Sequence, residues 1–268
     1  MPIEPFEIFA IRYAHLGDRH PGENSILADP HEAAADLDYF VWVIRRSDST
    51  YIVDTGFAQE AATRRKRTLL RNPAEAMHML LSIDPEKVTD VILTHLHYDH
   101  AGNLDRFPTS RIHVQDREVS YATGRSMTYG PLRMPFDLED VLHMIRHVYA
   151  GRAVFHDGDA ELAPGLTIHR VGGHSAGLQV VRVWTARGWV VLASDASHFY
   201  EGFQKQRIFP VVYNIGEMLE GYRLLYRLAD SPDHIIPGHD PLVMKLYPAA
   251  RPDLDGVVVR LDVSPKAS

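Results

Sequence analysis

The 268-residue chain contains no cysteine, so a disulfide framework and thiolate metal ligands are both excluded. It has no apolar stretch near the roughly 20 residues that a membrane-spanning helix needs. Its first residues lack the basic region and apolar core of a secretion signal. A formal net charge of −7 leaves no basic excess for binding nucleic acid. These absences predict a cytoplasmic protein with no membrane or nucleic-acid partner.

Hydrophobic residues make up 45% of the chain, enough to bury a large core. Strand-like and helix-like segments alternate along it, which predicts an α/β fold in a single domain spanning residues 1–268. The expected strands are 6–13, 39–44, 50–53, 91–93, 111–114, 153–156, 166–171, 179–185 and 189–193, with a short one before His239. The expected helices are 58–70, 73–81, 136–149 and 216–228.

Four potential metal ligands follow the apolar strand 91–93 within six residues: His95, His97, Asp99 and His100. Imidazole and carboxylate groups both bind divalent ions, and the cluster holds too many donors for one tetrahedral centre. Surface histidines in a loop are the alternative interpretation. The position after a strand favours metal binding, because open α/β folds place ligands at the carboxyl ends of strands. The cluster therefore predicts part of a two-metal site.

Three further donors occur later in the chain, each after a strand-like run that ends in small residues. They are His174, Asp195 and His239. Taken singly, each would more often be a turn residue, a packed core histidine or a helix cap. A dinuclear site needs ligands from several elements, so the recurrence of one pattern at three places favours metal ligands.

The motifs THLHYDHAGN, GGHSAG, ASDAS and PGHD, together with Asp54-Thr55-Gly56, resemble those of the metallo-β-lactamase superfamily over most of the chain. The resemblance implies an αββα sandwich: two mixed β-sheets flanked by helices, with the metals at one edge. It also implies a role for each donor residue. His95, His97 and His174 would hold the first metal, Asp99, His100 and His239 the second, Asp195 would bridge them, and Asp54 would orient a ligand histidine.

Within that superfamily, His97 stands where the diiron flavoproteins carry glutamate, and cysteine-liganded β-lactamases need a cysteine. Both groups are therefore disfavoured, which leaves two Zn²⁺ ions as the expected cofactors, with Mn, Fe or Co as other divalent candidates. The 29 residues after His239 are too few for the C-terminal domain of glyoxalase II or the appended domains of RNA-processing members. The N-acyl homoserine lactonase group is the most similar.

This resemblance implies a metal-dependent hydrolase that opens the ring of N-acyl homoserine lactones, a quorum-quenching reaction, by attack of a metal-bridging hydroxide. The expected partner is accordingly a small lactone or ester. Two alternatives remain open. One is a hydrolase of another lactone, ester, thioester or β-lactam, and the other is a non-enzymatic zinc-binding protein.

The chain departs from the lactonases at His198, where they usually carry a tyrosine three residues after the bridging aspartate. We expect His198 to polarise the substrate carbonyl, with Tyr200 as a substitute and Asp99 as the proton carrier. A surface residue at the end of a strand is the alternative for His198. The departure leaves the identity of the lactone open.

Residues 121–135 form a predicted loop rich in tyrosine, methionine and glycine. Met127 and Tyr129, with the neighbouring Leu132 and Met134, are candidates for an apolar wall that binds an acyl chain, and Phe199 is a further candidate. Ordinary core packing, or contacts in a homodimer, would explain the same residues equally well.

Overall fold

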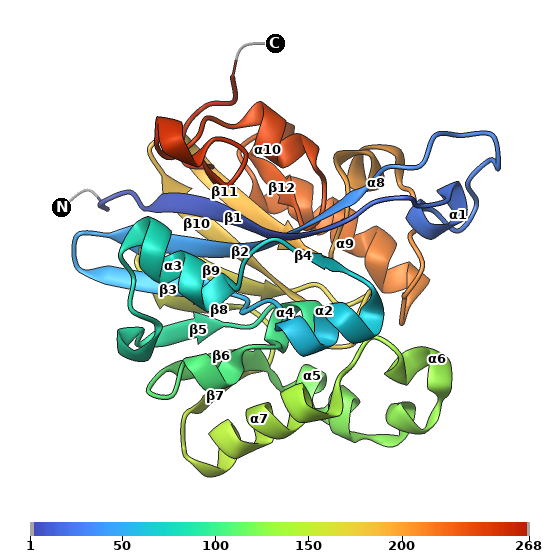
Figure 1. The fold of residues 1–268 in the computed structure, drawn as a ribbon, viewed down its shortest axis with the longest axis horizontal. Helices are drawn as coiled ribbons and strands as arrows, with labels where there is room; N and C mark the ends of the chain where they lie inside the picture. The colour runs from blue at the N-terminus through green and yellow to red at the C-terminus, as the bar shows by residue number, and fades with distance from the viewer. Residues whose placement is uncertain (1–2, 267–268) are drawn as a thin grey trace.

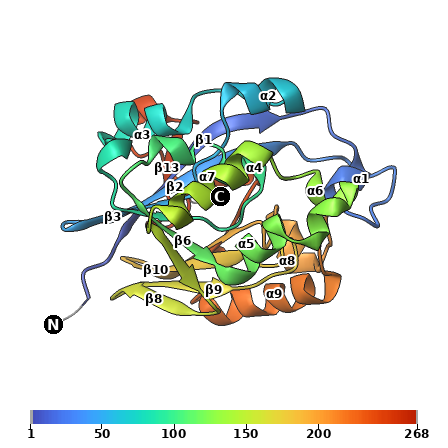
Figure 2. The ribbon, with the colours of Figure 1, turned by 90° about the horizontal axis from the view of Figure 1, so that it is seen from below.

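The computed structural model describes residues 3–266 and contains two β-sheets packed face to face (Figures 1 and 2). The first sheet has eight strands. In spatial order they are β13 (Val258–Arg260), β1 (Glu7–Leu16), β2 (Leu37–Arg46), β3 (Ser49–Val53), β5 (Asp90–Ile92), β6 (Arg111–Gln115) and β7 (Ala153–His156), with β4 (Thr68–Leu69) paired to β1.

The second sheet has five strands. Their spatial order is β12 (Ile235–Pro237), β11 (Gly188–Ser194), β10 (Gln179–Thr185), β9 (Leu166–Arg170) and β8 (Ala160–Ala163). Both sheets are mixed, because β3, β5, β6 and β7 pair in parallel in the first and β11 pairs in parallel with β12 in the second. The remaining pairs are antiparallel.

Helices cover the outer face of each sheet. α2 (Gln59–Arg65), α3 (Pro73–Leu81) and α7 (Leu138–Tyr149) pack on the first sheet, and α9 (Ile215–Leu228) packs on the second (Figure 2). The other helices are α1 (Pro21–Asn24), α4 (Tyr98–Ala101), α5 (Asp116–Thr123), α6 (Gly130–Arg133), α8 (Tyr200–Lys205) and α10 (Leu242–Leu246). Within residues 3–266, no helix combines the length and apolarity needed to cross a membrane.

The hydrophobic core has three layers, which follow from the two-residue period of the strands. In β1, Ile8 and Ala10 face the second sheet, whereas Phe9 and Ile11 face the helices. A third layer lies between the second sheet and α9. Because the first sheet is covered on both faces, its strands are apolar on both sides. The predicted αββα sandwich is confirmed.

The predicted helix 58–70 is wrong at its C-terminal end, because α2 stops at Arg65. Lys66 takes a left-handed conformation with φ 54°, and its amide bonds back to the last turn as a helix cap. The chain then turns so that Leu69 pairs with Ala14 of β1. The gain of sheet hydrogen bonds at β4 outweighs the helix propensity of this basic segment.

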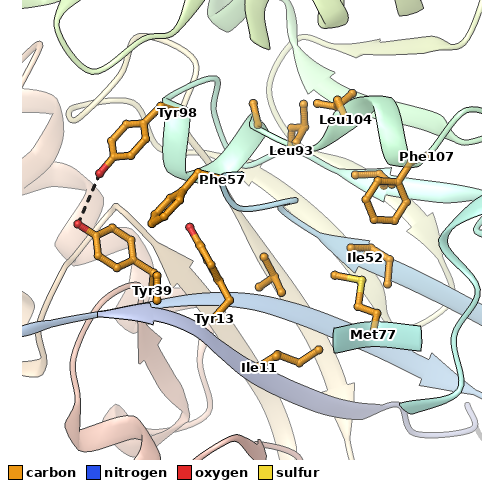
Figure 3. Close-up of a cluster of buried hydrophobic side chains, with 14 of the residues drawn as sticks. Ile11, Tyr13, Tyr39, Ile52, Phe57, Met77, Leu93, Tyr98, Leu104 and Phe107 are labelled. Atoms are coloured by element: carbon orange, nitrogen blue, oxygen red, sulfur yellow. Dashed lines mark hydrogen bonds between the residues drawn. The ribbon is translucent and has the colours of Figure 1, made fainter. Parts of the chain in front are cut away.

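An aromatic cluster supports the loop that follows β5 (Figure 3). The ring of Phe57 stacks on that of Tyr98 with centroids 5.5 Å apart, and the hydroxyls of Tyr39 and Tyr98 lie 3.5 Å apart. Tyr13 donates a hydrogen bond of 2.8 Å to the carbonyl of Asp99. These contacts fix the backbone of α4, which carries two of the predicted ligands.

Candidate metal centre

The seven predicted metal ligands all follow the carboxyl ends of strands. His95, His97, Asp99 and His100 follow β5, and His174, Asp195 and His239 follow β9, β11 and β12. These last three strands run in the same direction, because β9 and β11 each pair antiparallel with β10 and β12 pairs parallel with β11. Their carboxyl ends therefore meet at one edge of the sandwich, beside the end of β5.

Among the described residues, four groups of three have potential ligand atoms no more than 4.8 Å apart. Two of them, His95–His100–Asp195 and His174–Asp195–His198, contain Asp195. The other two share no residue: the first group is His95, His97 and His174, and the second is Asp99, His100 and His239. The five histidines of these last two groups are at most 3% exposed, whereas the side chain of Asp99 is 12% exposed. Each group has the size and composition of a metal-binding site.

The carboxylate of Asp195 lies between the two groups. Its Oδ2 is 3.2 Å from Nε2 of His174 and 4.0 Å from Nε2 of His95. Its Oδ1 is 3.3 Å from Nε2 of His100 and 3.0 Å from Nε2 of His239. One oxygen therefore faces each group, which is the arrangement that a bridging carboxylate needs.

The residues present fit two bound metal ions. Among the described residues, His95 Nε2 and His100 Nε2 are buried without a hydrogen-bond partner. Unpartnered buried nitrogens are costly, and a metal ion at each would satisfy them. Burial lowers the pKa of His95 and of His97 well below the usual 6.5, whereas at His100 and His239 the Asp195 carboxylate outweighs burial and raises the pKa. A bound metal ion would take the place of the ring proton at these last two. Imidazole and carboxylate donors together suit zinc.

Asp54 lies behind the predicted ligands and is linked by hydrogen bonds to two of them, directly to His100 and through Thr94 to His95. It is fully buried and accepts a hydrogen bond of 2.7 Å from Nδ1 of His100. It also accepts from the amide and the hydroxyl of Thr94, both at 2.8 Å. The Thr94 hydroxyl lies 3.1 Å from Nδ1 of His95. With Nδ1 acting as the donor in both rings, His100 and His95 present the Nε2 lone pair to the metal positions.

His239 is fixed by Asp38, which sequence reasoning missed. Nδ1 of His239 donates to the carbonyl of Asp38 at 2.9 Å, and the amide of Asp38 donates to the carbonyl of His239 at 3.0 Å. Gly238 allows the close packing here, since a Cβ would lie 2.6 Å from the carbonyl of Ser194. The backbone contact at Asp38 leaves no pattern in the sequence.

His198 contacts the central aspartate. Its Nε2 lies 3.1 Å from Oδ2 of Asp195, and its ring stacks on Phe209 with centroids 3.6 Å apart. Burial lowers the pKa of His198 to about 3, so the ring is neutral and Nε2–H donates to the carboxylate. Its Nδ1 is buried without a partner in the described part of the chain.

The structure does not bring Tyr200 to the ligand cluster. Its ring packs against the apolar layers on both faces of the second sheet, 6.1 Å from the ring of Phe203. Burial, with Tyr247 close by, raises the pKa of Tyr200 well above 10. The hydroxyl is therefore a neutral group inside the packing.

A cavity of about 560 Å³ opens over His97 and His174. Its walls come from Ile26, Tyr121, residues 130–132 and 134–135, and residues 210–213. Within the described chain, no lysine, arginine, aspartate or glutamate lines this cavity. It is therefore an uncharged, mainly apolar space that ends at the first group of histidines.

The predicted substrate-contact residues Met127, Tyr129 and Phe199 are not among the residues that line this cavity. Met127 packs against the hydrophobic core, and Tyr129 is 57% exposed. Phe199 lines a separate cavity of about 510 Å³ next to α8 and α10. Leu132 and Met134 line the cavity over the histidines. Ile26 reaches it because its amide donates to the carbonyl of Ile208 at 2.8 Å, a contact that no sequence pattern signals.

Comparison with known proteins agrees with this geometry. Residues 35–239 match the model of the metallo-beta-lactamase superfamily. The N-acyl homoserine lactonase AiiB of Agrobacterium fabrum is 26% identical over 209 residues, which cover 68% of this chain and 75% of the relative.

Two solved structures share the fold over nearly the whole chain. The crystal structure of a quorum-quenching N-acyl homoserine lactone lactonase superposes with a TM-score of 0.74 at 22% identity, covering 90% of this chain and 94% of that one. An N-acyl homoserine lactone hydrolase with N-hexanoyl-L-homoserine bound at its catalytic metal centre superposes with a TM-score of 0.73 at 21% identity, covering 91% and 96%.

Proposed function

Since the chain belongs to the metallo-β-lactamase superfamily, we propose that it is a dizinc hydrolase that opens the ring of N-acyl homoserine lactones. One observation carries this proposal: two groups of three potential ligands lie on either side of Asp195, and the first of them forms the end of an uncharged apolar cavity. The lactonase names of its relatives support the substrate class. Residues 1–268 would act together as one domain.

In this proposal His95, His97 and His174 hold one ion, Asp99, His100 and His239 hold the other, and Asp195 contacts both. Two bound divalent ions supply a water of lowered pKa, from about 16 towards about 7, and polarise a carbonyl. The protein fixes the donors through the contacts of Asp54 and Asp38 described above. It also excludes bulk water with the apolar walls over His97 and His174.

Asp99 is the proposed proton carrier. Within the cluster it is the more exposed of the two carboxylates, at 12% against 4% for the side chain of Asp195. Its Oδ2 lies 3.8 Å from Nε2 of both His100 and His239, and its backbone is fixed by Tyr13. A carboxylate that faces the substrate can pass a proton to the leaving alkoxide when the ring opens.

The cavity is proposed to bind the acyl chain. A charged chain would lose its hydration there without gaining a partner, because the described walls carry no charge. For a neutral acyl chain, each buried methylene adds about 0.8 kcal/mol of favourable binding free energy, which corresponds to a roughly fourfold higher affinity. The walls therefore favour longer unsubstituted chains, up to the length that the cavity accepts.

The experiment that tests this function is a pH-indicator assay of the zinc-loaded protein. We expect hydrolysis of N-acyl homoserine lactones, with kcat/KM rising up to about 16-fold for each added pair of methylenes from butanoyl to octanoyl, as far as the added methylenes are buried. Simple γ- and δ-lactones should react more slowly. Turnover confined to a β-lactam or a glutathione thioester would contradict the lactonase proposal in favour of another hydrolase. Inertness on every ester with two metals bound would indicate a non-enzymatic zinc protein.

A second prediction concerns His198: we propose that its Nε2–H, which contacts Asp195 here, donates to the substrate carbonyl once the Asp195 carboxylate is engaged as a metal ligand. His198→Phe keeps an aromatic ring to stack on Phe209 but removes the donor. We expect kcat to fall about 100-fold, the usual cost of losing one oxyanion donor. Metal content, measured by elemental analysis, should stay at two ions per chain.

His198→Tyr is the matched control, because it differs from the Phe variant by one hydroxyl and restores a donor. Most of the lost turnover should return in this variant. An unchanged kcat in the Phe variant would reject the proposed role. Loss of a metal ion from the Phe variant would instead place His198 among the ligands.

A further inference from the structure

Glu118 is a fully buried carboxylate that the proposed reaction does not use. It lies in the first turn of α5, which follows β6 and lies beside the second sheet in Figure 2. Burial raises the pKa of Glu118. A buried carboxylate is costly unless donors surround it. The donors that surround Glu118 come from two other parts of the chain.

One oxygen of Glu118 accepts a hydrogen bond of 2.9 Å from the amide of Leu96. The other accepts from the amide of Gly177 at 2.9 Å and from the hydroxyl of Ser175. The single carboxylate thus joins the segment after β5 to the segment after β9. In the sequence these partners lie 22, 57 and 59 residues from Glu118.

Both of these segments carry ligands of the same group. Leu96 lies between His95 and His97, and Ser175 is next to His174. The ligand atoms of these three histidines lie within 4.8 Å of one another. A shift of either segment would separate His174 from the other two. The hydrogen bonds to Glu118 oppose that shift from the side away from the metal.

The backbone of the loop after His174 packs closely against the backbone of Glu118. A Cβ added at Gly177 would lie 2.2 Å from the backbone nitrogen of Glu118, a distance at which the backbone would have to move. The loop after His174 therefore lies directly against the start of α5. Glycine at this position lets the Gly177 amide reach the carboxylate.

We propose that Glu118 is a positioning residue that fixes the spacing between the His95–His97 pair and His174, and thereby sets the affinity of the first metal position. This inference rests on the proposed metal centre. It extends that proposal to a residue outside the ligand set and the walls of the cavity.

The test is a cobalt(II) titration of metal-free wild-type and Glu118→Gln protein, followed by the visible d–d absorption of the bound ion. Glutamine keeps the size of the side chain but turns an NH₂ group toward a donor, either Leu96 or the Ser175–Gly177 pair. We expect one of the two cobalt equivalents to bind about 10- to 100-fold more weakly, with an altered spectrum, while the other is retained.

Asp262→Asn is the matched control. Asp262 is a buried carboxylate that accepts from the amide of Ile8 and from the guanidinium of Arg260, both at 3.2 Å, and within residues 3–266 it bonds to no residue of a ligand segment. Its variant should lose stability but bind cobalt as the wild type does. Unchanged binding in Glu118→Gln, or equal weakening of both equivalents, would overturn the inference. A wild-type protein that binds no cobalt would refute the metal centre itself.

If Glu118→Gln does not fold, the variant Ser175→Ala tests the positioning role of Glu118 instead. It removes one of the three donors and adds no charge or bulk. A several-fold weaker binding of one cobalt equivalent supports the positioning role. Wild-type affinity in Ser175→Ala, with Glu118→Gln unfolded, would reduce Glu118 to a stabilising residue and overturn the inference.

Discussion

Replacing Asp195 by alanine is expected to remove most of the bound metal and to lower kcat/KM at least about 1000-fold. Two divalent ions bring four positive charges, and only Asp195 and Asp99 supply negative charge within the ligand groups. Asp195 also faces both groups, with contacts of 3.0–3.3 Å to His100, His174 and His239. Without Asp195, Asp99 is the one carboxylate left within the ligand groups to balance the charge of the two ions, so both ions should bind more weakly. The water activation that the ions supply is lost with them.

The measurement is elemental analysis after dialysis, paired with turnover of an N-acyl homoserine lactone. Asp230→Asn is the matched control, because the carboxylate of Asp230 accepts from the amide of Trp189 at the opposite end of the same strand, β11. That variant should keep two ions and normal turnover. An Asp195→Ala protein with two ions and undiminished activity would rule out the proposed bridge.

Asp54→Asn is expected to weaken metal binding about 10- to 100-fold and to lower the free energy of unfolding by about 3 kcal/mol. Asparagine fits the left-handed backbone of this position, φ 61°, so the change tests the carboxylate and not the turn. An amide NH₂ facing Nδ1 of His100 would draw the ring proton to Nε2. That nitrogen is the one proposed to bind the ion.

The two effects are separated by measuring zinc affinity with a competing chelator and stability by urea unfolding of the metal-free protein. Asp90→Asn is the control, since Asp90 begins β5 and accepts from His113 at 2.9 Å and from Arg111 at 2.7 Å, at the opposite end of the strand from the ligands. It should lose stability without losing zinc affinity. A normal zinc affinity in Asp54→Asn would show that Asp54 does not orient a ligand.

The ligand residues could be located from the sequence because each is signalled locally. The sequence pattern is a predicted strand followed by one or two small residues and then a potential ligand. It occurs at His174, Asp195 and His239. The alternation of strands and helices indicated an α/β class, and the αββα sandwich was implied by the resemblance of the motifs to the metallo-β-lactamase superfamily. The structure then brings all seven predicted residues to one edge of the sandwich.

Residues that act through tertiary contacts could not be found in this way. Glu118 resembles any other glutamate in the first turn of a helix, and its three partners are far away in the sequence. Asp38 acts through its backbone, which carries no sequence signature. Local conformation also decides that Met127 and Tyr129 do not line the cavity over His97 and His174, whereas Leu132 and Met134 do. Helical turns at 125–128 and 130–133 determine which side chains of this segment face inward.

The ligands span 145 positions of the chain, from His95 to His239, and come from the ends of strands in both sheets. Contacts of such long sequence separation form late, since chain entropy must be lost before they are made. No partly folded chain can then present a complete metal site. Zinc would enter only after the two sheets have packed, so it would leave the folding rate unchanged and slow unfolding instead. The metal centre would therefore stabilise the folded αββα sandwich kinetically, by slowing its unfolding, and would not direct its folding.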